Sequence, residues 1–134
     1  MNYNLNKNCP CQSTLIFSNC CYNILLDHSK AKQAIDVLRA RYSSYFLKNI
    51  QYIEKSMAKN AIKDFDASET KKWMNDTKFI KLHIINQEKV QKNENISYIE
   101  YKATISHKHT ISIIHETSCF EKINNIWYYT GAAK

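Results

Sequence analysis

The 134-residue chain is long enough for one globular domain with a small appendage, and its composition, 44% hydrophobic and 12% aromatic, excludes a disordered protein. The net charge of +7 comes mainly from lysines scattered along the sequence, so we do not expect nucleic acid as a partner. No apolar run is long enough to cross a membrane, and the polar N-terminus lacks a secretory leader. We therefore expect a cytoplasmic protein in which thiols stay reduced.

The first notable segment, CPCQSTLIFSNCC at residues 9–21, holds four of the five cysteines. One residue separates Cys9 from Cys11, and Cys20 and Cys21 are adjacent. Two such pairs on either side of a short loop can converge on one tetrahedral ion, and soft thiolates favour Zn²⁺. Disulfides or a redox centre are the alternatives, but in a reducing compartment we expect a structural zinc site with these four cysteines as ligands.

Helical periodicity follows the cysteine segment. Apolar side chains recur at steps of three and four over residues 29–46, which predicts a helix there, with Asp27 or Ser29 as its N-cap. A second helix is expected at about 50–57. A third should cover 66–74, because it opens on a capping-box pattern with aspartate in the capping role.

The hydrophobic period then changes to two, which is typical of strands. Strands are expected over residues 79–85, 97–105, 109–122 and 126–129, with an Asn-Asn turn before the last. Helices followed by an antiparallel meander predict an α+β fold in which the helices pack on one face of the sheet.

The cysteine segment resembles the SEC-C motif, the zinc-binding tail of the SecA translocation ATPase that also occurs on many other bacterial proteins. That motif reads C-x-C-G-S-G-K-x-Y and ends in a Cys-Cys or Cys-His pair. This chain keeps all four ligand positions, and Ser13 and Phe17 also match. It differs at Gln12, Thr14 and Leu15, where the motif has its glycines and lysine. The differences should affect metal binding little, but they bear on any partner surface, so the SecB chaperone is not an expected partner.

The rest of the chain resembles the YchJ family, which opens with a SEC-C motif. The resemblance lies in LRARYSSYFLKNIQYI, in W…FIKLHII and in HETSCF…WYY. It implies a zinc module with its connector over residues 1–28. It also implies a domain over residues 29–134 similar to nuclear transport factor 2, with a curved sheet wrapped by helices around a cone-shaped cavity.

Several residues are candidates to line that cavity. Arg41 and Tyr42 lie in the middle of the long helix that should face it, and an arginine there can bind a carboxylate in bidentate fashion. We prefer the alternative that Arg41 pairs with Glu116 and locks the helix to the sheet. Trp127 is a further candidate, although we expect it and Trp73 to be core residues.

His115 and Glu116 are adjacent on a strand, so they point to opposite faces and cannot form a dyad directly. We assign His115, together with Ile111, Ile113 and Cys119, to the concave face. There it is either a general base or, as we prefer, a hydrogen-bonded core residue.

These patterns favour a zinc-binding protein that acts as a binding or interaction module rather than an enzyme. The sequence has no Gly-rich phosphate loop and no nucleophile elbow. The alternatives are a small-molecule enzyme of the isomerase or lyase type that uses the cavity, and a nucleic-acid-binding zinc protein. Expected partners are an unidentified protein, a small molecule in the cavity and, through the open sheet face, a second copy of the chain.

Overall fold

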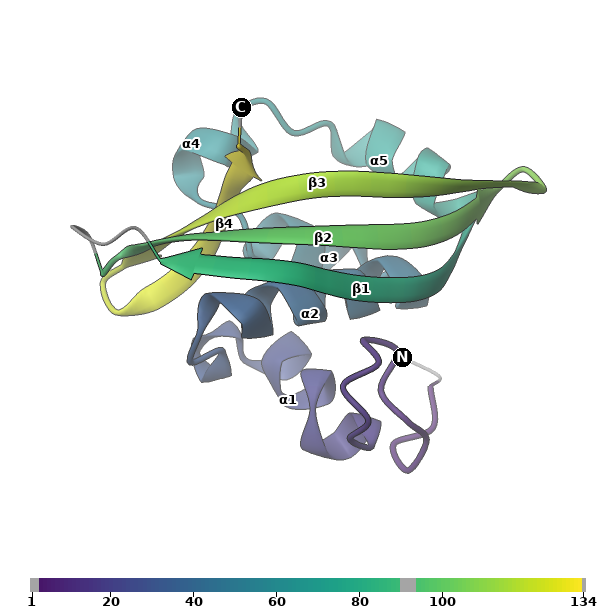
Figure 1. Cartoon of the computed structure of the whole chain (residues 1–134), viewed down its shortest axis with the longest axis horizontal. Helices are drawn as coiled ribbons and strands as arrows, with labels where there is room; N and C mark the ends of the chain where they lie inside the picture. Colours follow the sequence, from purple (N-terminus) through teal and green to yellow (C-terminus); the bar gives the residue numbers. More distant parts are fainter. Residues whose placement is uncertain (1–2, 90–93, 134) are drawn as a thin grey trace.

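The computed structural model describes residues 3–89 and 94–133. Its centre is an antiparallel sheet with the strand order β1-β2-β3-β4. The strands are β1 (Thr77–Lys89), β2 (Ile96–His107), β3 (Thr110–Ile123) and β4 (Ile126–Ala132). Helices α2 and α3 pass behind this sheet in Figure 1, which confirms the predicted α+β fold with an antiparallel meander.

The helices precede the sheet in the chain. They are η1 (Phe17–Asn19), α1 (Cys21–Leu26), η2 (His28–Lys30), α2 (Ala34–Leu47), α3 (Ile50–Lys55), α4 (Lys59–Ile62) and α5 (Ala67–Asn75). The long helix α2 begins later than predicted, because Asp27 caps the separate 3-10 turn η2. Gln33 and Asp36 then form a capping box at the start of α2. Asp66 caps α5 as predicted, since its side chain accepts a hydrogen bond from the Glu69 N–H.

The strand turns follow from residues that tolerate left-handed backbone. Asn124 and Asn125, between β3 and β4, have φ values of 51° and 68°. Asparagine visits this region more readily than most residues, so the predicted Asn-Asn turn is confirmed.

Helix α2 is packed on two sides, and each side has its own hydrophobic cluster. The cluster against the sheet includes Val37, Leu38, Ile99, Phe120 and Trp127. The cluster against the N-terminal segment includes Cys9, Cys11, Phe17, Ala40 and Tyr52. The cysteine segment therefore shares a core with α2 and α3, and contacts cross the predicted boundary at residue 28.

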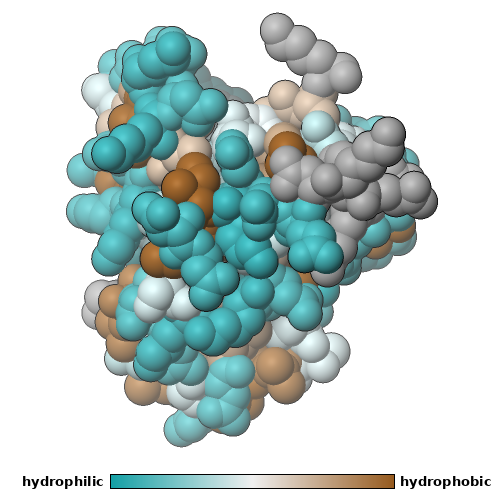
Figure 2. Space-filling view, turned by 90° about the vertical axis from the view of Figure 1, so that its left-hand side faces the viewer, coloured by the Kyte–Doolittle hydropathy of each residue, from teal (hydrophilic) through white to brown (hydrophobic). Residues whose placement is uncertain are grey.

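The outer surface is mostly polar where Figure 2 shows it. Hydrophilic side chains cover most of that side, and hydrophobic ones form small separate areas. Within the described residues, no helix is long and apolar enough to cross a membrane.

Candidate metal centre and cavity

Two short backbone features present the four cysteine sulfurs. Cys9 and Cys11 lie in a tight loop, in which the Cys9 N–H donates to the Leu15 carbonyl and the Gln12 N–H donates to the Cys9 carbonyl, at 2.8 and 3.1 Å. Cys20 lies between η1 and α1, and Cys21 is the first residue of α1. A loop and a helix start thus face one another.

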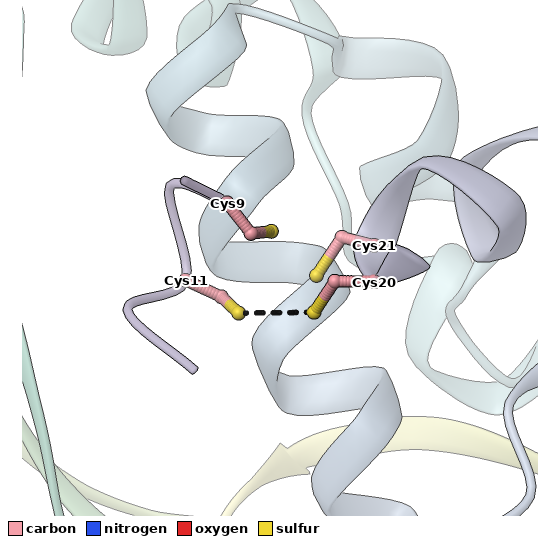
Figure 3. A group of neighbouring side chains, drawn as sticks. All are labelled: Cys9, Cys11, Cys20 and Cys21. Carbon is pink, nitrogen blue, oxygen red and sulfur yellow. Dashed lines mark hydrogen bonds between the residues drawn. The ribbon is translucent and has the colours of Figure 1, made fainter. Parts of the chain in front are cut away.

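The sulfur atoms converge. The four Sγ atoms all lie within 4.8 Å of one another, and those of Cys11 and Cys20 are 3.6 Å apart. Figure 3 shows the four side chains turned toward a common centre. Tetrahedral zinc with Zn–S bonds of about 2.3 Å needs sulfurs about 3.8 Å apart. The structure therefore brings the two pairs together as their spacing predicts, and the cluster can hold a metal ion.

The thiols share protons in this arrangement. Hydrogen bonds from Cys20 and then Cys21 hold the pKa of Cys11 well below its usual range. The bond with Cys11 correspondingly raises the pKa of Cys20, and bonds with Cys11 and Cys20 raise that of Cys21. Ser13 adds a further contact, with its Oγ 3.1 Å from the Cys20 sulfur. A divalent cation at the centre would replace these protons, so metal binding releases protons and strengthens as pH rises.

Three side chains connect the cysteine cluster to the rest of the fold. From α2, Arg39 Nη1 donates to the Cys11 carbonyl at 2.8 Å, and Ser43 Oγ lies 3.6 Å from the Cys9 sulfur. From the loop itself, the Gln12 amide reaches the edge of β1. The sequence reasoning missed these anchors, because nothing in the local pattern signals contacts with residues so distant in the chain.

A second candidate site is a cavity of about 150 Å³ between α2 and the inner face of the sheet. Its apolar walls include Leu38, Tyr45, Phe79, Leu82 and Phe120. The predicted candidates Arg41, Tyr42 and Glu116 also line it, together with Tyr101 and Tyr129.

Arg41 and Glu116 each have a partner other than the predicted one. Arg41 Nη1 donates to the Ile53 carbonyl at 2.9 Å and to Ser56 Oγ at 2.8 Å. The guanidinium carbon also lies 3.9 Å from the centre of the Tyr129 ring. Glu116 accepts a hydrogen bond from the Tyr101 hydroxyl at 2.8 Å. The ion pair that we preferred for Arg41 and Glu116 does not form between these two described residues, because α3 holds the guanidinium.

The prediction of which β3 side chains face the inside of the sheet is wrong. The side chain of His115 is 51% exposed, and its Nε2 lies 2.7 Å from Glu100 on the outer face. Ile111 and Ile113 share that face and are 69% and 61% exposed. The alternate residues, Glu116 among them, face the cavity. Isoleucine occurs on both faces of this strand, so hydrophobicity alone could not orient it.

Trp127 is a core residue, as we expected, and the alternative role as a cavity residue is wrong. It is buried in the cluster between α2 and the sheet, as a core residue, and is not part of the cavity wall. Its carbonyl accepts a hydrogen bond from His28 Nε2 at 2.6 Å. His28 itself was missed by the sequence reasoning, since an isolated histidine in a short connector carries no pattern.

Tyr42 has an unusual environment. Its ring packs edge-on against Phe79, and its hydroxyl is buried with no hydrogen-bond partner among the described residues. Burial raises the pKa of this phenol to about 12, so it stays protonated at neutral pH. A buried hydroxyl without a partner is costly, which makes this wall of the cavity a place where a polar ligand atom or a water is favoured.

Comparisons with known proteins agree with the fold. Residues 33–132 match the family model described as "YchJ, middle NTF2-like domain". A UPF0225 protein of Haemophilus influenzae (strain 86-028NP) is 32% identical over 123 residues, covering 92% of this chain and 75% of that protein. A UPF0225 protein of Photorhabdus laumondii is 30% identical, covering 94% of this chain and 80% of that protein.

Two solved structures share the architecture. The solution structure of a SEC-C motif containing protein from Rhodopseudomonas palustris has a TM-score of 0.82 at 25% identity, covering 94% of this chain and 97% of that chain. The crystal structure of a SEC-C motif containing protein from Psychrobacter arcticus has a TM-score of 0.80 at 22% identity, covering 94% of this chain and 82% of that chain. The predicted resemblance is confirmed, and the chain belongs to the YchJ family, with a SEC-C-type cysteine cluster ahead of an NTF2-like domain.

Proposed function

We propose that this protein is a cytoplasmic binding protein in which Cys9, Cys11, Cys20 and Cys21 hold one structural zinc ion. The observation that carries the proposal is the convergence of four sulfur atoms within 4.8 Å of one another. Four thiolates suit zinc in charge and softness, and such a cluster persists where thiols are kept reduced.

A site of this kind is structural because all four ligand positions come from the protein. Catalytic zinc keeps one position open for water or substrate, and a four-cysteine set leaves none. Three of the four cysteines are also buried, which separates the ion from solvent.

The ion stabilises the contact between the N-terminal segment and α2. The N-terminal segment has little core of its own, and its buried side chains pack with Ala40 of α2 and Tyr52 of α3. The binding free energy of the metal therefore contributes to folding, and α2, which carries Arg41 and Tyr42, is fixed on the side opposite the cavity.

Binding rather than catalysis fits what lies at the cavity. His115, the first candidate for a general base, is on the outer face of the sheet. The Arg41 Nη1 group donates to two internal acceptors, so this nitrogen is not available to a substrate carboxylate. A protein partner and a second copy of the chain stay predictions.

The test is the metal content of protein purified without added metal. We expect about one zinc per chain in the wild type and much less in Cys20→Ser and in Cys21→Ser. Cys119→Ser is the matched control, because Cys119 is on β3, outside the cluster of four cysteines. This variant should keep its zinc. A wild-type chain with almost no zinc, or equal loss in the control variant, would contradict the assignment.

A further inference from the structure

The cavity between α2 and the sheet has the size and walls of a site for one small ring. Its volume of about 150 Å³ is the volume at which an apolar protein cavity takes up benzene. The rings of Tyr45 and Phe79 stack with their centres 5.4 Å apart, and Trp73 meets Phe79 edge-on at 5.8 Å. Flat aromatic walls of this kind favour a planar occupant.

The charges on the walls favour an occupant without net charge. Arg41 and Glu116 both line the cavity, and they do not neutralise each other in a direct pair. An ion in this small space is attracted by one of these charges and repelled by the other, so little attraction remains to offset the cost of removing the ion from water. A neutral molecule avoids this cost.

Hydrogen bonding adds a further requirement. Glu116 already accepts from the Tyr101 hydroxyl, and a carboxylate has further lone pairs for a second donor. Tyr101 keeps its proton, because burial raises the pKa of this phenol. The remaining acceptor capacity of Glu116 therefore suits a ligand that brings an N–H or O–H group.

A surface depression adjoins the cavity. This open polar depression is bounded by α4, α5 and β4. It shares three lining residues with the cavity: Arg41, Tyr45 and Tyr129. Asn60 and Asp64 stand at this depression. The depression and the cavity thus have a common wall, and the cluster of cysteines lies on the opposite side of α2.

We propose that this cavity binds a small, uncharged, planar ring compound that carries an N–H or O–H donor, and that Glu116 accepts the hydrogen bond from that donor. The aromatic walls favour a planar ligand, and Glu116 favours a ligand with an N–H or O–H donor over one without.

Indole and benzofuran test the proposal, because they have the same shape and differ in a ring N–H against a ring oxygen. Titration of the whole metal-loaded chain, followed by amide chemical shifts, should show indole binding about tenfold more tightly than benzofuran. Benzoate should bind at least about tenfold more weakly than indole, because repulsion by Glu116 opposes attraction by Arg41 and the cost of removing its charge from water remains. Equal affinity for indole and benzofuran, or the absence of binding by either, would overturn the proposal.

Variants assign the selectivity to one carboxylate. Glu116→Gln should bring the two affinities to within about twofold, because the amide can turn its own N–H toward the ligand. Glu100→Gln is the matched control, since that carboxylate faces outward to His115, and it should keep the preference. A preference that survives Glu116→Gln, or is lost in Glu100→Gln, would contradict the role of Glu116.

The location of binding is tested separately. Ala103 lines the cavity and is 2% exposed, so Ala103→Leu should fill the space and abolish indole binding. In the wild type, shifts at Tyr101, Ala103 and Tyr129 give the same information if that variant fails to fold. Shifts confined to the outer face of the sheet would overturn the proposal. Zinc content measured on the same samples separates this outcome from a failure of the metal assignment.

Discussion

The side-chain oxygen of Gln12, in the metal-binding loop, accepts a hydrogen bond from the backbone N–H of Leu82 in β1, at 3.2 Å. The nitrogen of the same amide donates to the carbonyl of Ile80 at 3.0 Å. Because β1 is at the edge of the sheet, no strand of the described part of the chain pairs with these backbone groups on that side. A single side chain thus continues the hydrogen bonding of the sheet and ties the cysteine loop to its edge.

Gln12→Ala should therefore destabilise the protein. Two hydrogen bonds at a partly solvated edge are together worth about 1–2 kcal/mol, and we expect the free energy of unfolding in urea to fall by this amount. Gln12→Gly should lose less than Gln12→Ala, because Gln12 has a φ of 63°, a region that glycine adopts without strain. Equal stability of wild type and Gln12→Ala would show that the amide contacts contribute nothing.

Thr14 is strained in the same loop. Its φ is 77°, and β-branched residues rarely adopt this region. Thr14→Gly should raise the free energy of unfolding by about 1 kcal/mol, the relief of left-handed strain being partly offset by the flexibility of glycine. Leu15→Gly is the control: Leu15 is exposed and has no positive φ, so the same change there should lower stability. A destabilised Thr14→Gly would mean that its side chain, rather than its backbone, holds the loop.

These two positions also show what the motif could and could not predict. The convergence of the cysteines was predictable, because a short loop and thiol chemistry leave few alternatives. From the sequence alone, the departures at Gln12 and Thr14 indicate a change to a partner surface. In the structure both have positive φ, which gives a backbone reason for glycines at the corresponding positions of the motif.

The parts that sequence could not predict depend on distant contacts. The outward orientation of His115 depends on which face of β3 lies against α2. Because isoleucines occur on both faces of this strand, the alternating pattern does not determine which face is buried. The partners of Arg41 come from α3, and no local spacing indicates which acceptors an arginine will reach.

Arg41→Lys should cost about 2–3 kcal/mol of unfolding free energy. Arg41 is buried, with two donated hydrogen bonds and a ring contact to Tyr129, and a lysine cannot reproduce this planar geometry. Arg39→Lys is the matched control on the same helix, since Arg39 is half-buried and donates to a single carbonyl. Chemical denaturation of both variants checks the prediction, and a loss in Arg39→Lys as large as in Arg41→Lys would contradict it.

His28 should make stability depend on pH. The residue is buried, its Nε2–H donates to the Trp127 carbonyl, and its Nδ1 accepts from the Tyr52 hydroxyl at 2.8 Å. Burial holds the pKa of His28 below its usual value of 6.5. The unfolded chain therefore takes up a proton at a pH where the folded chain stays neutral, and unfolding becomes easier as pH falls below about 6.5.

The expected result is a free energy of unfolding that decreases by up to about 1.4 kcal/mol per pH unit below 6.5, until the folded pKa of His28 is reached. The cysteine cluster also loses metal affinity as pH falls, so the comparison is between wild type and His28→Gln, which share the cluster. The variant should be less stable at pH 7.5, where neutral His28 makes both hydrogen bonds. It should lose less stability than the wild type between pH 7 and pH 5.5, because glutamine does not titrate. Parallel pH profiles for the two proteins would show that protonation of His28 is not linked to unfolding.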